Sequence, residues 1–104
     1  MPFTVTGAAE APWLFAGTGL ANGSTFGRYG IEIDAAGAAS PPGTIVLARI
    51  PDLLGPGKSA EMTYYETAAG AKVFNAGAIN FAATATEEPV STMLENLWAR
   101  LSTP

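Results

Sequence analysis

The sequence predicts an α+β domain, in which a small and mainly antiparallel sheet has a C-terminal helix packed on its last hairpin. Three observations support this fold class. The chain has 104 residues, the length of a single domain, and it is 48% hydrophobic but only 13% charged. Two strand-like runs near the C-terminus are separated by a short turn, and the final segment has apolar residues at helical spacing. We therefore expect residues 1–104 to fold as one domain.

Three short runs in the N-terminal half have the composition of strands. Residues 3–6 include the β-branched Val5 and predict an edge strand. Residues 29–34 alternate apolar with polar side chains, which predicts a half-buried strand whose acids face water. Residues 44–50 are rich in aliphatic side chains and stop at Pro51, so they predict a third strand. Glycine-rich or proline-rich segments predict loops at 17–23, 35–43 and 52–59.

A hairpin is predicted in the C-terminal third of the chain. Residues 60–67 and 71–81 are strand-like, and the connection between them ends with Gly70. A three-residue hairpin loop favours glycine at that place, because the backbone there adopts the left-handed conformation. The spacing therefore predicts two antiparallel strands joined by a tight turn.

The register of this hairpin follows from the side chains that it would bring together. It places Tyr64 opposite Phe74, which is an aromatic pair, and Glu66 opposite Lys72, which is a pair of opposite charge. Pairs of both kinds stabilise antiparallel strands, so both favour this register.

A helix is predicted from about Pro89 to Leu101. Glu87 and Glu88 would lie near the positive end of its dipole, with Pro89 in the first turn. Six apolar residues then follow the spacing i, i+3, i+4, i+7, i+8 and i+11 and make one continuous stripe, formed by Val90, Met93, Leu94, Leu97, Trp98 and Leu101. We expect this stripe to be buried against the hairpin.

The composition argues against several classes of function. Nine acidic and five basic residues give a net charge of −4, and the basic residues are scattered, so nucleic acid is not an expected partner. The absence of Cys and His removes disulfides, thiolate ligands, the commonest zinc ligand and the commonest general base. No segment approaches the roughly 18 apolar residues of a membrane span. The low charge indicates a surface that contacts another copy of the chain or the rest of a larger protein.

Two local patterns in the N-terminal half invite a functional interpretation. Gly17-Thr18-Gly19 is similar to the start of a dinucleotide-binding fingerprint, but Asn22 takes the third glycine position and no helical pattern follows. A turn is the better interpretation. Glu32 and Asp34 share one strand face about 7 Å apart, which would suit a metal or a catalytic carboxylate pair. A solvated sheet edge is the simpler interpretation, because two carboxylates alone hold a hard cation weakly.

Glu66 is the candidate catalytic residue. It continues the strand face of Met62 and Tyr64, so partial burial at the margin of the core would raise its pKa and suit it to acid–base work. The alternative, which the residues alone favour, is a cross-strand ion pair with Lys72. No serine or threonine is a candidate nucleophile, because the chain has no histidine to activate one.

Five short blocks of sequence suggest a family. They are WLFAGTGL at 13–20, YGIEID at 29–34, MTYYET at 62–67, AKVF at 71–74 and NLW at 96–98. Together these blocks resemble the C-terminal part of bacterial proteins related to the large (beta) subunit of N,N-dimethylformamidase. The likeness extends from about Trp13 to Leu101 and is a pattern of blocks without a single diagnostic motif.

The resemblance implies a fragment of a larger α/β protein that hydrolyses amide C–N bonds. In that family iron is held by tyrosine and glutamate side chains, on a scaffold with a region similar to class I glutamine amidotransferases. The ligand segment of the family lies upstream of the part seen here, so no metal or cofactor ligand is carried onto this chain. Glu66 matches a family position that looks like an active-site glutamate. Many relatives look like exported multidomain proteins, which is compatible with a secreted or cell-surface parent.

Two functions are compatible with these observations. In the first, the chain is the C-terminal module of a formamidase-like amide hydrolase. It contributes Glu66 and core surface to a site completed outside this chain, with iron bound by the full-length parent. In the second, the chain is a non-catalytic structural or protein-interaction module of a multidomain bacterial protein.

Overall fold

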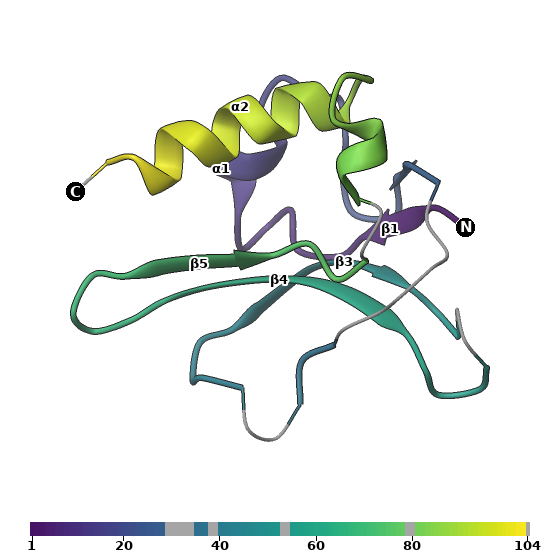
Figure 1. The fold of residues 1–104 in the computed structure, drawn as a ribbon, viewed down its shortest axis with the longest axis horizontal. Helices are drawn as coiled ribbons and strands as arrows, with labels where there is room; N and C mark the ends of the chain where they lie inside the picture. Colours follow the sequence, from purple (N-terminus) through teal and green to yellow (C-terminus); the bar gives the residue numbers. More distant parts are fainter. Residues whose placement is uncertain (29–34, 38–39, 53–54, 79–80, 104) are drawn as a thin grey trace.

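The computed structural model describes residues 1–28, 35–37, 40–52, 55–78 and 81–103 (Figure 1). Within these residues, a five-stranded antiparallel sheet of order β2-β1-β3-β4-β5 carries α1 and α2 on one face. The predicted α+β class is confirmed. The elements in chain order are β1 (Phe3–Val5), α1 (Pro12–Phe15), β2 (Thr25–Phe26), β3 (Ile45–Ile50), β4 (Ala60–Glu66), β5 (Lys72–Asn75), the 3-10 helix η1 (Phe81–Thr84) and α2 (Val90–Leu101).

The first strand is an interior strand, whereas the sequence predicted an edge strand. β1 pairs with β2 through Phe3 and Phe26, and with β3 through Val5 and Ala48. β2 has two residues and is too short for any periodicity to indicate it. Its Phe26 is nevertheless buried and stacks on Phe3, with ring centroids 5.7 Å apart. The strand predicted at 29–34 lies outside the described residues.

β3 confirms the third predicted strand, and a bulge changes which of its side chains are buried. The register with β4 shifts between Val46 and Ala48. As a result the consecutive residues Leu47 and Ala48 are both buried, which strict alternation does not allow. The Leu47 carbonyl accepts hydrogen bonds from the amides of Thr6 and Gly7, each at 3.0 Å. The bulge therefore also ties the segment after β1 to β3.

β4 and β5 form the predicted hairpin in the predicted register. Tyr64 lies opposite Phe74, and Glu66 lies opposite Lys72. Gly70 has a φ of 93°, which is the left-handed conformation predicted for the end of the loop. The cross-strand pairs and the turn residue thus agree with the observed structure.

β5 ends at Asn75, earlier than the predicted end at residue 81. The chain turns at Gly77, which has a φ of 77° and lies against the backbone of β4. A Cβ atom at Gly77 would be 2.2 Å from the carbonyl oxygen of Glu61, so only glycine fits this approach. Phe81 begins η1 instead of ending a strand. The residue types of segment 71–81 do not indicate that Gly77 packs against the backbone of β4. The early end of β5 could therefore not be predicted from them.

α2 confirms the predicted C-terminal helix, although it begins at Val90, one residue after the predicted start. The Glu88 carboxylate accepts a hydrogen bond from the backbone amide of Thr92 at 2.8 Å, and it also binds the Thr92 hydroxyl. An acid at this end therefore satisfies one of the free amides of the first turn, as the sequence indicated.

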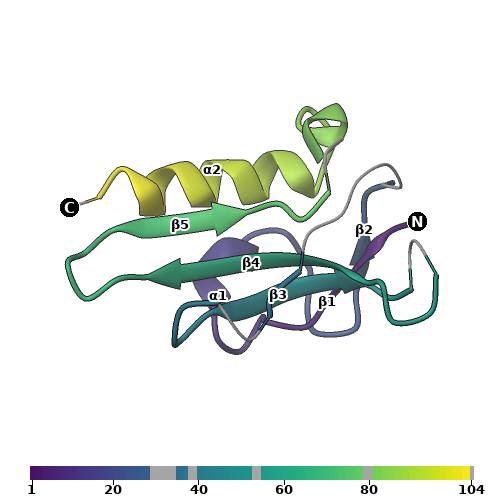
Figure 2. The ribbon, with the colours of Figure 1, turned by 60° about the horizontal axis from the view of Figure 1, so that its bottom comes forward.

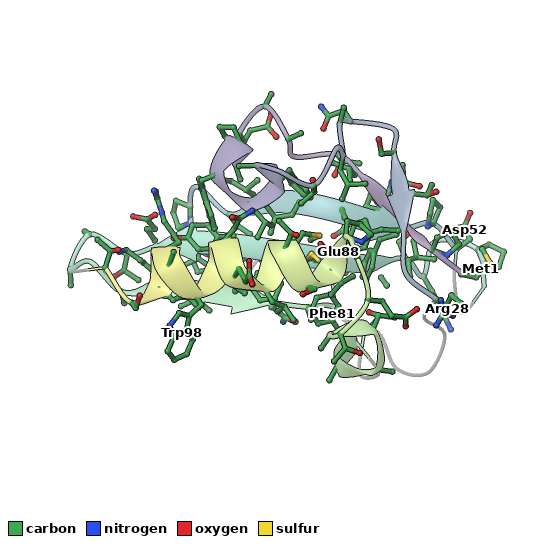
Figure 3. All side chains as sticks on the ribbon, turned by 90° about the horizontal axis from the view of Figure 1, so that it is seen from above. Met1, Arg28, Asp52, Phe81, Glu88 and Trp98 are labelled. Atoms are coloured by element: carbon green, nitrogen blue, oxygen red, sulfur yellow. The ribbon has the colours of Figure 1, made fainter. Side chains whose placement is uncertain are left out.

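Part of the predicted apolar stripe of α2 is exposed, so the expectation that all six residues pack is wrong. The buried members are Val90, Met93 and Leu97, and Leu94 is half-buried. Trp98 is 76% exposed, and Leu101 is also exposed. Figure 3 shows Trp98 projecting from the side of the helix, away from the body of the molecule.

Helix geometry explains why Trp98 is exposed. The buried residues Val90, Met93 and Leu97 have the spacing i, i+3 and i+7, and Arg100 continues this line at i+10. Trp98 lies about 100° further round the helix than Leu97. From the last turn of the helix, Arg100 reaches the hairpin and pairs with Glu66.

α2 lies along the hairpin and is also attached to α1. Figure 2 shows α2 running beside β5, with α1 behind the strands. The Asn96 side-chain amide donates hydrogen bonds to the carbonyls of Leu14 and Ala16, each at 2.8 Å. The core is thus formed between one face of the sheet and both helices. Among the described residues, no helix is long and apolar enough to span a membrane.

Candidate functional site

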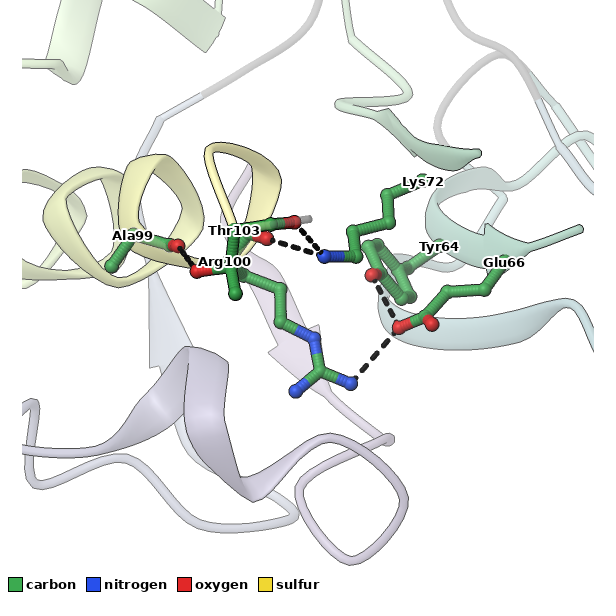
Figure 4. A network of polar contacts seen from close by, with 6 residues as sticks. All are labelled: Tyr64, Glu66, Lys72, Ala99, Arg100 and Thr103. Atoms are coloured by element: carbon green, nitrogen blue, oxygen red, sulfur yellow. Dashed lines mark hydrogen bonds and ion pairs between the residues drawn. The ribbon is translucent and has the colours of Figure 1, made fainter. Parts of the chain in front are cut away.

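Four polar residues meet where the C-terminal end of α2 approaches the β4–β5 hairpin (Figure 4). Tyr64 and Glu66 come from the end of β4, Lys72 from the start of β5, and Arg100 from the last turn of α2. Strand alternation places Tyr64 on the core face, where it is 2% exposed, and brings Glu66 to the rim on the same side. We name these four residues the hairpin–helix cluster.

Glu66 is held through one of its two carboxylate oxygens. Its Oε2 accepts a hydrogen bond from the Tyr64 hydroxyl at 2.7 Å and an ion-pair contact from Arg100 Nη2 at 2.9 Å. Its Oε1 accepts no hydrogen bond from any residue that the structure describes. Because the side chain is 38% exposed, this second oxygen is available to an outside group.

The pKa of Glu66 shifts in the direction opposite to the one expected from partial burial. The pKa of Glu66 is lowered from its ordinary value of 4.5, first by the hydrogen bond from Tyr64 and then by the Arg100 guanidinium, and desolvation opposes both. The pKa of Tyr64 is raised from 10.0, first by burial and then by the hydrogen bond to Glu66. Glu66 is therefore an ionised carboxylate at neutral pH, and Tyr64 is a neutral donor.

Lys72 does not form the predicted ion pair with Glu66 within the part of the chain described. The two residues are register partners, but the guanidinium of Arg100 takes the carboxylate. The Lys72 ammonium instead donates to the backbone carbonyls of Arg100, at 3.1 Å, and of Thr103. Free carbonyls and a partial negative charge gather at the end of a helix, so Lys72 stabilises the C-terminus of α2.

Trp13 completes the packing of the cluster from α1. Its ring packs edge-on against Tyr64, with centroids 4.9 Å apart, and the guanidinium carbon of Arg100 lies 5.0 Å from its centroid. Arg100 Nε is buried without a hydrogen-bond partner, and the ring face offers its positive charge a compensating interaction. Neither Trp13 nor Arg100 was predicted as a member of the site. The signal for Arg100 was present, because it follows Leu97 by three positions on the face expected to cover the hairpin.

The other candidate residues do not join this cluster. Gly17 and Gly19 have φ values of 75° and 74°, and they belong to the loop that the sequence predicted. Within the described residues the loop follows the four-residue α1, whereas a dinucleotide-binding turn would join a strand to a helix. Glu32 and Asp34 lie outside the described residues.

The described residues do not fit an iron site of their own. Among them, no group of three or more acidic side chains comes close enough together to hold a metal ion. Glu66 also has the positive charge of Arg100 at 2.9 Å, which disfavours a metal cation at the same carboxylate.

The chain is similar to a known protein family. A sequence model of a protein family described as N,N-dimethylformamidase beta subunit-like, C-terminal, matches residues 1–91. No curated protein and no solved structure matches the chain. The matched segment contains Trp13, Tyr64, Glu66 and Lys72, whereas Arg100 lies beyond its end.

Proposed function

This chain belongs to the N,N-dimethylformamidase beta subunit-like C-terminal family, and from that premise we propose that it is the C-terminal module of an amide C–N hydrolase. In this proposal the module contributes Glu66 to an active site that residues outside this chain complete. The family match supports the module assignment, and the geometry of one carboxylate supports the contribution of Glu66.

The observation that carries the role of Glu66 is the unequal use of its two oxygens. Oε2 is fixed by Tyr64 and Arg100, so the carboxylate has a defined orientation. Oε1 has no partner among the described residues and belongs to a side chain that is 38% exposed. A carboxylate that is held on one side and open on the other can orient a water molecule without moving.

The lowered pKa limits the chemistry that Glu66 can perform. Hydrolysis adds the oxygen of water to the carbonyl carbon, breaks the C–N bond and leaves the nitrogen with an added proton. A carboxylate whose proton is disfavoured is a weak proton donor at neutral pH, so Glu66 is not the acid that protonates the leaving nitrogen. It acts as a hydrogen-bond acceptor that positions the attacking water. The iron implied by the family resemblance would be bound by residues of the parent protein outside the described part of this chain.

The test is Glu66→Gln in the full-length parent protein, with dimethylformamide as substrate and release of dimethylamine as the readout. We expect kcat/KM to fall by about 100-fold or more, because the amide oxygen is a much weaker acceptor than a carboxylate. Glu95→Gln is the matched control, since Glu95 is exposed on α2 and its side chain forms no hydrogen bond or ion pair with the described residues. Full hydrolysis by a folded Glu66→Gln variant would end the catalytic assignment.

A second function is favoured by the exposed apolar residues near the end of α2. Trp98 is 76% exposed, and Leu101 and Val73 are also among the exposed large apolar side chains. Such residues are typical of protein contact surfaces. In this alternative the module serves assembly of the parent protein without contributing to catalysis. The same experiment separates the two functions, because a purely structural module predicts equal hydrolysis by Glu66→Gln and Glu95→Gln.

A further inference from the structure

The face of the sheet opposite α2 has a polar centre of its own, unrelated to the hairpin–helix cluster. Arg49 on β3 and Glu61 on β4 are register partners, and their side chains point away from the buried residues that flank them along each strand. Figure 1 shows the loop around residues 40–44 extending below the sheet on this side, away from α2. A hollow of about 380 Å³ opens here, next to the loop that joins β3 to β4.

Arg49 is fixed in place by two neighbours. Its Nε contacts Glu61 Oε2 at 3.1 Å, and its Nη2 donates to Ser59 Oγ at 3.0 Å. Glu61 is only 15% exposed, and its other oxygen accepts a hydrogen bond from the Ala36 amide at 3.0 Å. The guanidinium is thus oriented before any ligand arrives, while Nη1 has no partner among the described residues.

The Ser59 hydroxyl has a hydrogen that needs an acceptor. Its oxygen already accepts from Arg49 Nη2 and, at 3.3 Å, from the Asp52 amide, which uses both lone pairs. No described residue accepts a hydrogen bond from this hydroxyl. Its O–H is therefore a free donor in the wall of the hollow.

Lys58 adds a second positive charge to the same hollow. Its ammonium forms no hydrogen bond or ion pair with the residues that the structure describes. Of the charged residues that line the hollow, Arg49 and Lys58 are positive and Glu61 is negative, which leaves one net positive charge. The nearby Asp52 does not line it, and its carboxylate accepts the Gly57 amide at 2.7 Å.

We infer that this hollow binds a carboxylate through Lys58, Arg49 and Ser59. The three side chains are free donors that line one space, and two of the three are held by neighbours before binding. A single net positive charge suits a monoanion such as a carboxylate better than a doubly charged phosphate. The carboxylate can belong to a free organic acid or to an acidic side chain elsewhere in the parent protein.

The test is a titration of this chain with sodium acetate at constant ionic strength, followed by backbone amide NMR. We expect saturable shifts at residues 35–37 and 57–61, with a dissociation constant on the order of 1 mM for a site open to water. Lys58→Met should weaken binding about tenfold, because it removes one charge-assisted contact. Ser59→Ala should weaken it as well.

Arg28→Gln is the control for net charge. It removes one positive charge from Arg28, which pairs with Glu87 away from the hollow, so acetate affinity should stay the same. An equal loss in Arg28→Gln and Lys58→Met, or shifts that do not saturate, would overturn the site.

A second titration on the full-length parent separates the two sources of the carboxylate. Acetate binding by both proteins indicates a site for a free acid. Binding by this chain alone indicates that an acidic side chain of the parent already occupies the hollow. Absence of binding by this chain contradicts the inference. None of these results depends on Glu66, so they are independent of the hydrolase assignment.

Discussion

β4 carries two glutamates that are each paired with an arginine, and the two pairs differ in what holds them together. Glu61 pairs with Arg49 on the neighbouring strand, on the sheet face opposite α2. Glu66 pairs with Arg100, which lies 34 residues later on α2 and reaches the hairpin only when the helix packs. The first pair is therefore positioned by strand register, whereas the second depends on helix docking.

The surroundings of the two carboxylates differ as well. Glu61 uses both oxygens, one for Arg49 and one for the Ala36 amide, and it is 15% exposed. Glu66 uses one oxygen for two donors and is 38% exposed. This comparison suggests that Glu61 has a fixed supporting role beside the proposed carboxylate site, while Glu66 keeps an oxygen free for an outside group.

The largest expected effect comes from removing the aromatic support of Glu66. Tyr64→Ala should lower the free energy of unfolding by about 3–5 kcal/mol, because it leaves a cavity beside Trp13 and under α2. Tyr65→Ala, on the opposite face and half-buried, should cost about 1–2 kcal/mol. Urea unfolding of the two variants measures the difference. An equal decrease in the free energy of unfolding for both variants would contradict the view that the main core lies on the face of β4 that packs against the helices.

A smaller effect is expected from the ion pairs themselves. A double-mutant cycle with Glu61→Gln and Arg49→Gln should give a coupling of about 1 kcal/mol, because one partner is largely shielded from water. The cycle with Glu66→Gln and Arg100→Gln should give a weaker coupling that disappears at high salt, since both partners are well exposed. If the Glu66–Arg100 coupling were the stronger of the two and did not depend on salt, the expected order of the two ion pairs would be wrong.

The smallest effect is a pH dependence that belongs to Glu66. Its folded pKa lies below the ordinary value of 4.5, so its stabilising contribution is complete above about pH 4.5 and is lost as the pH falls through the folded value. The stability difference between the wild type and Glu66→Gln should therefore shrink on acidification. Urea unfolding at a series of pH values measures it.

Tyr64→Phe is the control for the cause of this pH dependence. It removes the hydrogen bond that contributes most to the lowered pKa of Glu66. The free energy of unfolding of Tyr64→Phe should therefore change less between neutral and acidic pH than that of the wild type, although Glu66 is still present. Parallel pH curves for the wild type and Glu66→Gln would show that the carboxylate is not held as described.

The elements that were predicted correctly depend on residues close in sequence. Gly70 and the pairing of Tyr64 with Phe74 belong to one hairpin, and the helix from Val90 follows from a period of 3.6 residues. β2, the bulge after Val46 and the turn at Gly77 were not predicted. Each of them depends on a backbone that approaches from a distant segment, which local patterns do not report.

The candidate site shows the same division. Glu66 was identified from its strand face and its family resemblance, and its side chain is 38% exposed next to the buried Tyr64, so less of it is buried than expected. The raised pKa expected from partial burial was wrong, because the hydrogen bond from Tyr64 and the contact with Arg100 outweigh desolvation. Trp98 was expected in the core, and helix rotation places it in solvent instead.

Sequence order alone therefore determined the strand pairing of the hairpin, the extent of the last helix and the family to which the chain belongs. Tertiary structure decided which arginine meets which glutamate, which side of α2 is buried and which residues line the hollow beside Arg49. The physical reason is the distance along the chain over which each kind of interaction acts. Turn geometry and periodicity act over a few residues, whereas ion pairs, desolvation and hollows depend on segments that only folding brings together.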